Sequence, residues 1–324
     1  MDDIDRKLLL LLYENPRMHN QELEKRLRIS RQTVHYRMLA LAKSGVFRAF
    51  KPTISAHYLG ALPAAVWGRS RTTSVEEVLD RLGRNESVGR ADVAGGNYLY
   101  IFGLLRDASE LDDYVGFVKR AAEIPEPTVG LAVLGDEILP YLSGGEKRRE
   151  NYKRLSPLDL RIIISLRGNV RRPTTEIAEM IGVSAKTVGR RLNDMTSGGL
   201  LDYDSPWDIP LGEDMLTVVH VTVRGAADKV SVARRLRSND PIHLVYIRSF
   251  SNLPDFLLGL ISSNKMSEIR KILTEIREDE EVIEATPNLI YHERMYDHWT
   301  ERLPDIWLRN STDDRRRHQR SLVR

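Results

Sequence analysis

The chain has 324 residues, of which 41% are hydrophobic and 29% charged, a composition typical of a soluble globular protein with two to four domains. It contains no cysteine, which excludes disulfides, thiolate metal sites and cysteine nucleophiles. No apolar run approaches the ~20 residues of a membrane span, and the acidic N-terminus "MDDIDRK" lacks the apolar core of a signal peptide. We therefore expect a cytoplasmic protein with no membrane partner. The net charge of +3 leaves room for local basic surfaces.

The first fifty residues predict three helices. The first covers about 3–13, the second begins near Asn20 as its capping residue, and the third begins at Ser30. The third ends at Gly45, which suits the left-handed position that follows a helix. Only about three residues separate the second and third helices, which is the spacing of a helix-turn-helix. Arg28 occupies the turn, where a left-handed backbone would carry strain.

The chain then repeats this unit. A constant shift of 154 aligns residues 4–47 with 158–201 without a gap and gives 10 identities in 44 positions. The second copy starts at Ser156-Pro157, a good cap followed by proline, has Thr174 as the next cap and ends its third helix at Gly199. The identical pairs include Asn15/Asn169, Arg17/Arg171, Ser30/Ser184, Val34/Val188 and Arg37/Arg191. Because the apolar phase is also kept, we interpret the match as a duplication.

An α+β segment follows each helical unit. The first predicts strand 62–70, helix 74–84, strands 88–95 and 97–107, helix 109–124 and strand 128–135. The second predicts strand 215–225, helix 226–238, strands 242–250 and 255–262, helix 265–278 and strand 282–293. Both orders are β-α-β-β-α-β, the ferredoxin-like arrangement. The predicted fold class is α+β, with two helix-turn-helix (winged-helix-like) DNA-binding domains alternating with two ferredoxin-like βαββαβ domains.

These elements divide the chain into six segments. We expect a helix-turn-helix domain at 1–50, a ferredoxin-like effector or dimerisation domain at 51–142, and a glycine- and charge-rich linker at 143–155. A second helix-turn-helix domain follows at 156–204, then a second ferredoxin-like domain at 205–298, and a C-terminal helix with a basic tail at 299–324. In the C-terminal stretch "YHERMYDHWTERLPDIWLRN", Tyr291, Met295, Trp299 and Leu303 have near-helical spacing and predict a helix that packs on the second sheet or on a partner.

The ordered motifs resemble the leucine-responsive regulatory protein/AsnC (Lrp/AsnC) family of prokaryotic transcription regulators. "MDDIDRKLLLLL" and "LSPLDLRIIISL" match its opening motif, while "ISRQTVHYRMLALAKSGVF" and "VSAKTVGRRLNDMTSGGLL" match its helix-turn-helix. "ISAHYLG" and "WDIPLG" match the connection to the effector domain. A usual member has one such pair of domains, whereas this chain has two in tandem. The resemblance implies binding to double-stranded DNA, assembly as a homo-oligomer with a dimer favoured, and an amino acid or other small molecule as candidate effector.

The family often carries a "GxYDYLL"-like turn in its effector domain. The first copy reads "GNYLYIF", with Leu99 where the aspartate is expected, and the second reads "SNLPDFLL", with Ser251 in place of the glycine. Neither turn is complete, so effector binding is open. The effector-binding candidates are Gly95, Gly96, Asn97 and Tyr98 in the first copy, and Ser251, Asn252 and Asp255 in the second.

The third helix of each copy is the candidate recognition helix. With about 100° per residue, Val34 and Val188 centre the buried faces, while Gln32 and Tyr36, or Lys186 and Arg190, point outward toward base edges. Thr33 and Thr187 suit phosphate contacts near the helix start, and Arg37 and Arg191 suit a phosphate or an internal carboxylate. The candidate DNA-binding residues are Ser30, Arg31, Gln32, Thr33, His35, Tyr36 and Arg37, and Ser184, Lys186, Thr187, Arg190, Arg191 and Asn193. Because the two outward faces differ, we expect two unlike half-sites in the DNA.

Two alternatives stay open. Some proteins of this architecture are tetrapyrrole decarboxylases, and a ligand sensor with vestigial DNA-binding units is a third reading. The eight histidines are scattered, and no phosphate loop, dinucleotide fingerprint or serine elbow occurs. We therefore expect no enzyme activity, no catalytic residues, no cofactor and no metal. The five arginines in the last ten residues suit a nonspecific contact with phosphates. The sequence does not decide whether the two α+β domains pair within one chain or between chains.

Overall fold

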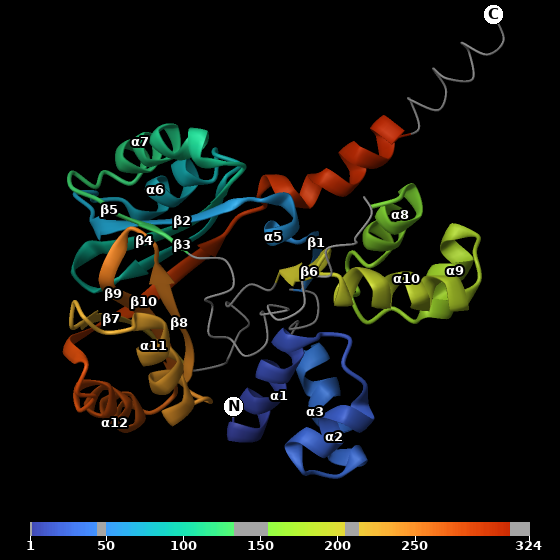
Figure 1. Cartoon of the computed structure of the whole chain (residues 1–324), viewed down its shortest axis with the longest axis horizontal. Coiled ribbons are helices and arrows are strands. Elements are labelled where there is room, and N and C mark those ends of the chain that lie inside the picture. The colour runs from blue at the N-terminus through green and yellow to red at the C-terminus, as the bar shows by residue number, and fades with distance from the viewer. Residues whose placement is uncertain (1, 44–49, 133–154, 205–213, 312–324) are drawn as a thin grey trace, which may run out of the picture.

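The computed structural model describes residues 2–43, 50–132, 155–204 and 214–311. Gly45, most of the expected linker and the arginine-rich tail lie outside these residues. In the view of Figure 1 the α+β domains lie on the left, the first helix-turn-helix unit lies below and the second lies on the right. Within the described residues, no helix is long and apolar enough to cross a membrane.

Among the described residues, each helix-turn-helix unit has three helices. The first contains α1 (Asp3–Glu14), α2 (Asn20–Leu27) and α3 (Arg31–Lys43), and the second contains α8 (Pro157–Ser165), α9 (Thr174–Ile181) and α10 (Ala185–Ser197). Both units begin with a reciprocal capping box, formed by Asp2 with Asp5 and by Ser156 with Asp159. The box satisfies backbone N–H groups of the first turn, so the entry of each unit is fixed.

The predicted caps of the second helices were wrong. Asn20 and Thr174 are the first residues of α2 and α9, and the preceding His19 and Pro173 make no side-chain capping hydrogen bond. The turn after these helices is left-handed in both copies, with φ of 55° at Arg28 and 72° at Gly182. Arg28 therefore adopts a conformation that glycine accepts more readily, as the sequence predicted.

The segments after the two units pair with each other. Strand β1 (Lys51–Ile54) lies antiparallel to β6 (Leu201–Asp204), and the short helix α5 (Ala56–Leu59) follows β1. Ile54 is fully buried in the core of the second unit, where Tyr58 and Leu59 also pack. The first copy thus contributes apolar side chains to the core of the second.

The α+β domains have the predicted element order. The first contains β2 (Leu62–Arg69), α6 (Val75–Leu82), β3 (Val88–Ala94), β4 (Tyr98–Leu105), α7 (Leu111–Ala121) and β5 (Thr128–Leu131). The second contains β7 (Met215–Val223), α11 (Lys229–Asn239), β8 (Leu244–Phe250), β9 (Leu253–Ser263), α12 (Met266–Arg277) and β10 (Val282–Met295). The short 3-10 turns η1 (Gly95–Asn97) and η2 (Ala108–Glu110) precede β4 and α7. Apolar faces of the helices pack on the strands of their own copy and form one core per domain.

The two domains share one eight-stranded sheet, in the order β5-β2-β4-β3-β10-β7-β9-β8. The long strand β10 joins them, because Ile290 is opposite Leu216 of β7 on one side and opposite Ala94 of β3 on the other. An isolated bridge between Ala132 and Phe250 links the two outer strands. The α+β domains therefore pair within the chain, and a third apolar cluster that includes Trp67 and Tyr100 lies between them.

The C-terminal segment differs from the prediction. Tyr291 and Met295 belong to β10, because this stretch completes the ladder with β3 and cannot also be helical. Trp299, in η3 (Trp299–Arg302), packs on the first α+β domain, where its indole Nε1 donates to the Leu104 carbonyl at 2.7 Å. In the part of this segment that the structure describes, residues 303–311 form an α-helix, and Leu303, Trp307 and Leu308 pack against the second helix-turn-helix unit.

Candidate nucleic-acid interface

The recognition helix α3 starts with a local capping arrangement. The Thr33 backbone N–H donates to Ser30 Oγ at 3.2 Å, and the two hydroxyls lie 2.9 Å apart. Val34, Met38 and Leu41 are buried, which fixes the helix on its unit. The Ser30 side chain thereby supplies the partner of a free N–H group at the helix start.

The outward face of α3 is exposed to solvent. Arg31, Gln32 and His35 are exposed, and Tyr36 keeps 63% of its surface accessible. The rings of His35 and Tyr36 are 6.3 Å apart. This face offers amide, imidazole and phenol groups, all of which can hydrogen-bond with base edges or phosphates.

The helix α10 has the same frame with different outward chemistry. The Thr187 N–H donates to Ser184 Oγ at 3.1 Å, and Val188, Leu192 and Met195 are buried. Lys186, Arg190 and Asn193 are exposed. The second unit therefore presents two cations and an amide where the first presents mainly neutral groups. Lysine and arginine favour guanine edges or phosphate.

Arg37 and Arg191 point away from these outward faces and contact the first helix of their own units. Arg37 Nη1 donates to Asp2 Oδ1 at 2.8 Å and to Asp5 Oδ1 at 2.5 Å. Hydrogen bonds with Asp2 and Asp5 raise the pKa of Arg37, and the bond from Arg37 lowers the pKa of Asp2.

The second copy repeats this contact. Arg191 Nε lies 3.4 Å from Asp159 Oδ1, and its Nη2 donates to Ser156 Oγ at 3.3 Å. Of the two roles that the sequence allowed for these arginines, the structure favours the internal carboxylate.

Comparisons with known proteins agree with this geometry. Residues 1–48 match a winged helix-turn-helix DNA-binding model, and residues 155–196 match the AsnC-type helix-turn-helix domain. An uncharacterized HTH-type transcriptional regulator of Pyrococcus horikoshii is 28% identical over 117 residues, which are 36% of this chain and 74% of the relative. One of Pyrococcus furiosus is 26% identical and is covered over 79% of its length. The chain thus resembles regulators of the Lrp/AsnC type, with two helix-turn-helix units in tandem. Its architecture is that of a DNA-binding transcription regulator with two unlike helix-turn-helix units.

A solved structure also aligns with nearly the whole chain. The siroheme decarboxylase NirDL aligns with 97% of this chain and 99% of its own, with a TM-score of 0.58 and 14% identity. At that identity the likeness concerns the fold alone. It shows that two helix-turn-helix units and two α+β domains occur together in this order in another chain.

Each of the two effector-turn candidates contacts a strand of the other copy, and the first turn accepts a hydrogen bond at the Gly95 carbonyl from Asn288 Nδ2 of β10 at 3.3 Å. In the first copy, Gly95, Gly96 and Asn97 form η1, and Asn97 Nδ2 donates to the carbonyls of Ser70 and Thr72 at 2.9 and 3.0 Å. Gly96 has φ of 68°, and a Cβ there would meet nothing within 4 Å. Tyr98 opens β4 directly after this turn and is partly exposed.

In the second copy the turn is occupied by the other domain. The Ser251 N–H donates to the Leu131 carbonyl at 2.8 Å, and Asn252 Nδ2 donates to the Val129 carbonyl at 2.8 Å. Asp255 is exposed on β9. Ser251 and Asn252 therefore bond to β5, and this turn is not free to bind a ligand in the same way. The seven effector-binding candidates do not lie together at one site.

Sequence reasoning missed a cluster between the α+β domains. Tyr100 Oη lies 2.8 Å from His220 Nε2, and the Trp67 ring stacks on Phe256 with centroids 5.5 Å apart. Burial lowers the pKa of His220 to about 4, so the imidazole is neutral at pH 7. Each contact joins one copy to the other, so only knowledge of the sheet pairing could have identified it.

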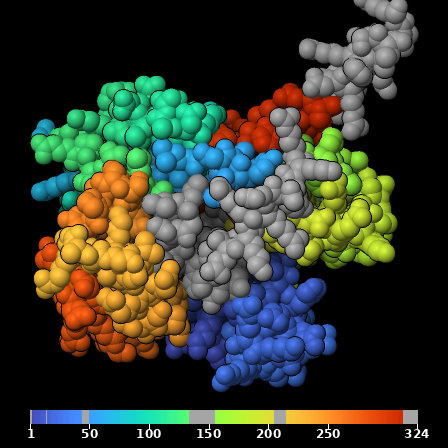
Figure 2. Space-filling view, in the orientation of Figure 1, coloured from blue at the N-terminus to red at the C-terminus, as the bar shows by residue number. Residues whose placement is uncertain are grey.

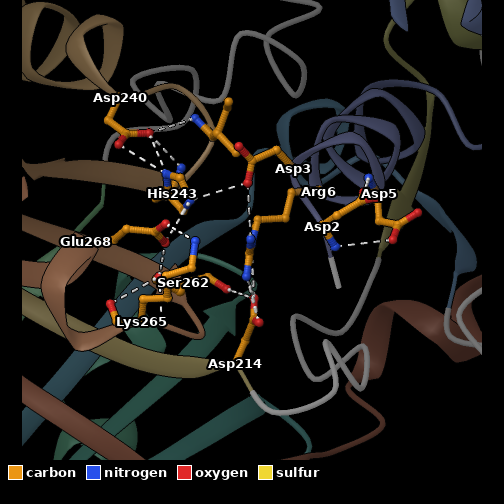
Figure 3. A network of polar contacts seen from close by, with 12 residues as sticks. Asp2, Asp3, Asp5, Arg6, Asp214, Asp240, His243, Ser262, Lys265 and Glu268 are labelled. Carbon is orange, nitrogen blue, oxygen red and sulfur yellow. Dashed lines mark hydrogen bonds and ion pairs between the residues drawn. The ribbon is translucent and has the colours of Figure 1, made fainter. Parts of the chain in front are cut away.

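A second missed site joins the first helix-turn-helix unit to the second α+β domain (Figure 3). Arg6 Nη2 donates to both carboxylate oxygens of Asp214, at 2.7 and 2.8 Å, and Ser262 Oγ donates to Asp214 Oδ2 at 3.1 Å. The side chains of Arg6 and Asp214 are only 5% and 1% exposed. At the position that corresponds to Arg6, the second copy has Leu160, so this contact belongs to the first unit alone.

His243 extends this polar network. Its Nδ1 lies 3.0 Å from Asp240 Oδ1, and its Nε2 lies 3.4 Å from Glu268 Oε2 and 3.9 Å from Asp3 Oδ1. The hydrogen bond with Asp240 raises the pKa of His243, which burial opposes. Within the described residues, no group of three or more histidine, cysteine or acidic side chains has a geometry that could hold a metal ion.

Proposed function

We propose that the chain regulates transcription by reading two unlike half-sites of double-stranded DNA with α3 and α10. The observation that carries this proposal is the difference between the outward faces, where Gln32 and Tyr36 correspond to Lys186 and Arg190. All four side chains are exposed, whereas Arg37 and Arg191, which the two recognition helices share, bond inside their own units. The outward positions therefore differ between the copies, whereas the shared arginines position the recognition helices.

In this proposal the residues divide by role. Gln32, His35 and Tyr36 in the first unit, and Lys186, Arg190 and Asn193 in the second, contact base edges in the major groove. Ser30, Arg31, Thr33, Ser184 and Thr187 lie at the helix starts and contact phosphates, together with the backbone N–H groups there. Arg37 and Arg191 position the helices and do not read bases.

Selection of duplexes from a random double-stranded library tests this proposal. We expect an enriched operator with two unlike halves, and mutating either half should weaken binding. Arg190→Ala should relax base selection in only one half-site of the operator. The loss of a bidentate contact should cost about 1–3 kcal/mol of discrimination between bases. Arg270→Ala, at an exposed position on α12, is the matched control. Equal binding to symmetric operators built from either half would contradict the proposal.

The effector, the oligomeric state and the location remain parts of the proposal. We place an amino-acid effector at the first turn, Gly95 to Tyr98, because Gly96 has open space beside it, whereas Ser251 and Asn252 of the second turn both bond to β5. A homodimer would need a surface outside the β3–β10 ladder, which is already used within the chain. A regulator of this kind acts in the cytoplasm, where prokaryotic DNA is. The shift of the melting temperature with each amino acid tests the effector, and the molar mass from light scattering tests the oligomeric state.

The second candidate function is tetrapyrrole processing. It is favoured by the coverage of the siroheme decarboxylase NirDL, which spans both copies. We propose instead that this chain is not an enzyme, because both of its helix-turn-helix units match DNA-binding models. Adding an iron tetrapyrrole and recording the visible absorption spectrum distinguishes the transcription regulator from the tetrapyrrole-processing enzyme. A saturable shift of the Soret band would favour the enzyme.

A further inference from the structure

Two arginines at corresponding positions join the helix-turn-helix units. Arg17 Nη1 donates to the Arg172 carbonyl at 3.0 Å and also to the Val170 carbonyl. Arg171 lies 154 residues after Arg17 and makes the reverse contact with the first unit.

The reverse contact uses equivalent atoms. Arg171 Nη1 donates to the Pro16 carbonyl at 2.6 Å, and its Nη2 donates to the Met18 carbonyl at 2.9 Å. Residues 16 and 18 become 170 and 172 under the shift of 154, so each arginine bonds the same pair of carbonyl groups in the other copy. Arg171 Nη2 also donates to Asn20 Oδ1 at 3.3 Å, at the start of α2. The joint therefore has an approximate two-fold axis.

Both guanidinium groups are partly buried. Burial lowers the pKa of Arg17 and Arg171, and the charge of Arg17 lowers the pKa of Arg171 further. Two like charges face each other across the joint, and the carbonyl dipoles of the two loops compensate for their repulsion. A planar group with several donors suits such a contact better than an ammonium.

The surroundings make the joint continuous with both cores. Val170 is fully buried in the core of the first unit, and Ile54 is fully buried in the core of the second. The β1–β6 ladder crosses the same joint. The two units therefore share apolar side chains in both directions and form one body rather than two tethered ones.

We propose that Arg17 and Arg171 are positioning residues that fix the separation and relative orientation of α3 and α10. The chain then reads its two unlike half-sites at one spacing and in one polarity. This inference rests on the proposed DNA binding, but the rigidity of the joint can be measured without DNA.

The absence of cysteine permits a direct measurement of the joint. Lys25→Cys and Glu179→Cys place spin labels at exposed, corresponding sites on α2 and α9. Pulsed electron resonance on the full chain should give a narrow distance distribution. Arg17→Ala with Arg171→Ala should broaden it about twofold, because four charged hydrogen bonds to carbonyls are lost. Arg172→Ala is the matched control, since that side chain contacts Glu176 and Met180 of its own unit.

A spacing series on the selected operator measures the consequence. Five inserted base pairs turn one half-site by about half a helical turn, and should weaken wild-type binding about tenfold or more. The affinity of the double alanine variant should fall less than about threefold on the same insertion, because a looser joint lets the two units rotate with the displaced half-site. The variant Arg17→Lys with Arg171→Lys keeps both positive charges but loses the planar group that donates to two carbonyls at once. It should also broaden the distance distribution between the spin labels.

The outcomes separate the two claims. A folded double variant, alanine or lysine, with the wild-type distance distribution overturns the inference, as does an unchanged spacing penalty. If the wild type binds no DNA duplex while the alanine pair broadens the distribution, the proposed function fails and the rigid joint stands. Circular dichroism at 222 nm verifies the fold of each variant.

Discussion

Arg6 of the first helix-turn-helix unit and Asp214 of the second α+β domain form a buried ion pair with two hydrogen bonds from one guanidinium nitrogen. The pair connects the most N-terminal helix to a residue more than 200 positions later. This pair joins the first DNA-binding unit to the paired sheets, and Figure 2 shows that unit (blue) beside the second α+β domain (yellow to orange).

Arg6→Leu should lower the free energy of unfolding by about 3–5 kcal/mol, because the Asp214 carboxylate would be left buried without a cation. Urea unfolding followed by circular dichroism measures the loss. The double variant Arg6→Leu/Asp214→Leu should recover most of it, since it leaves no unpaired charge. A single variant as stable as the wild type would mean that the pair does not hold the unit.

The stability that comes from His243 should depend on pH in a defined direction. Its pKa in the folded chain is raised above the ordinary value of 6.5, with Asp240, Glu268 and Asp3 as acidic neighbours and Arg6 as the opposing cation. Its contribution is therefore fully present below pH 6.5 and is lost as the pH rises through the folded pKa. His243→Gln should destabilise the chain more at pH 6 than at pH 9, measured by urea unfolding. An equal loss at both values would contradict this.

His220 should behave in the opposite way. Its pKa is lowered by burial to about 4, so the folded chain binds fewer protons than the unfolded chain between pH 4 and 6.5. Stability should fall as the pH is lowered through that window. An imidazole resonance that titrates near pH 4, and that disappears in His220→Gln, is the expected observation by nuclear magnetic resonance. Titration near 6.5 would show that the imidazole is solvated.

Arg37→Ala and Arg191→Ala should affect stability rather than base preference. Each removes a partly exposed ion pair with the first helix, for which we expect about 0.5–1 kcal/mol. Thermal unfolding measures the loss, and library selection should return the wild-type operator. A changed base preference at either half-site would assign these arginines to the DNA interface instead.

Local patterns predicted most of the fold. The 3.6-residue periods of Val34, Met38 and Leu41 and the β-rich strand runs identified the elements, because each depends on neighbours close in sequence. The pairing of β10 with β3 depends on residues about 200 positions apart, which no local pattern records. Tyr291, Met295 and Trp299 lie four residues apart, a spacing that fits one face of a helix and also one face of a strand, and the first two belong to strand β10.

The candidate site was predicted unevenly for a similar reason. The outward faces follow from helix geometry once Val34 and Val188 define the buried side. Arg17 and Arg171 were visible as an identity between the copies. Their role depends on where the other copy's carbonyls lie, and that required the structure.

The central claim is that the outward faces of α3 and α10 read different DNA sequences. Gln32→Lys with Tyr36→Arg gives the first face the side chains of the second at the corresponding positions. Selection from a random duplex library is the measurement. We expect the wild type to enrich two unlike half-sites. We expect the variant to enrich two similar ones, both like the half-site whose base selection Arg190→Ala relaxes. An unchanged operator for the variant would contradict it.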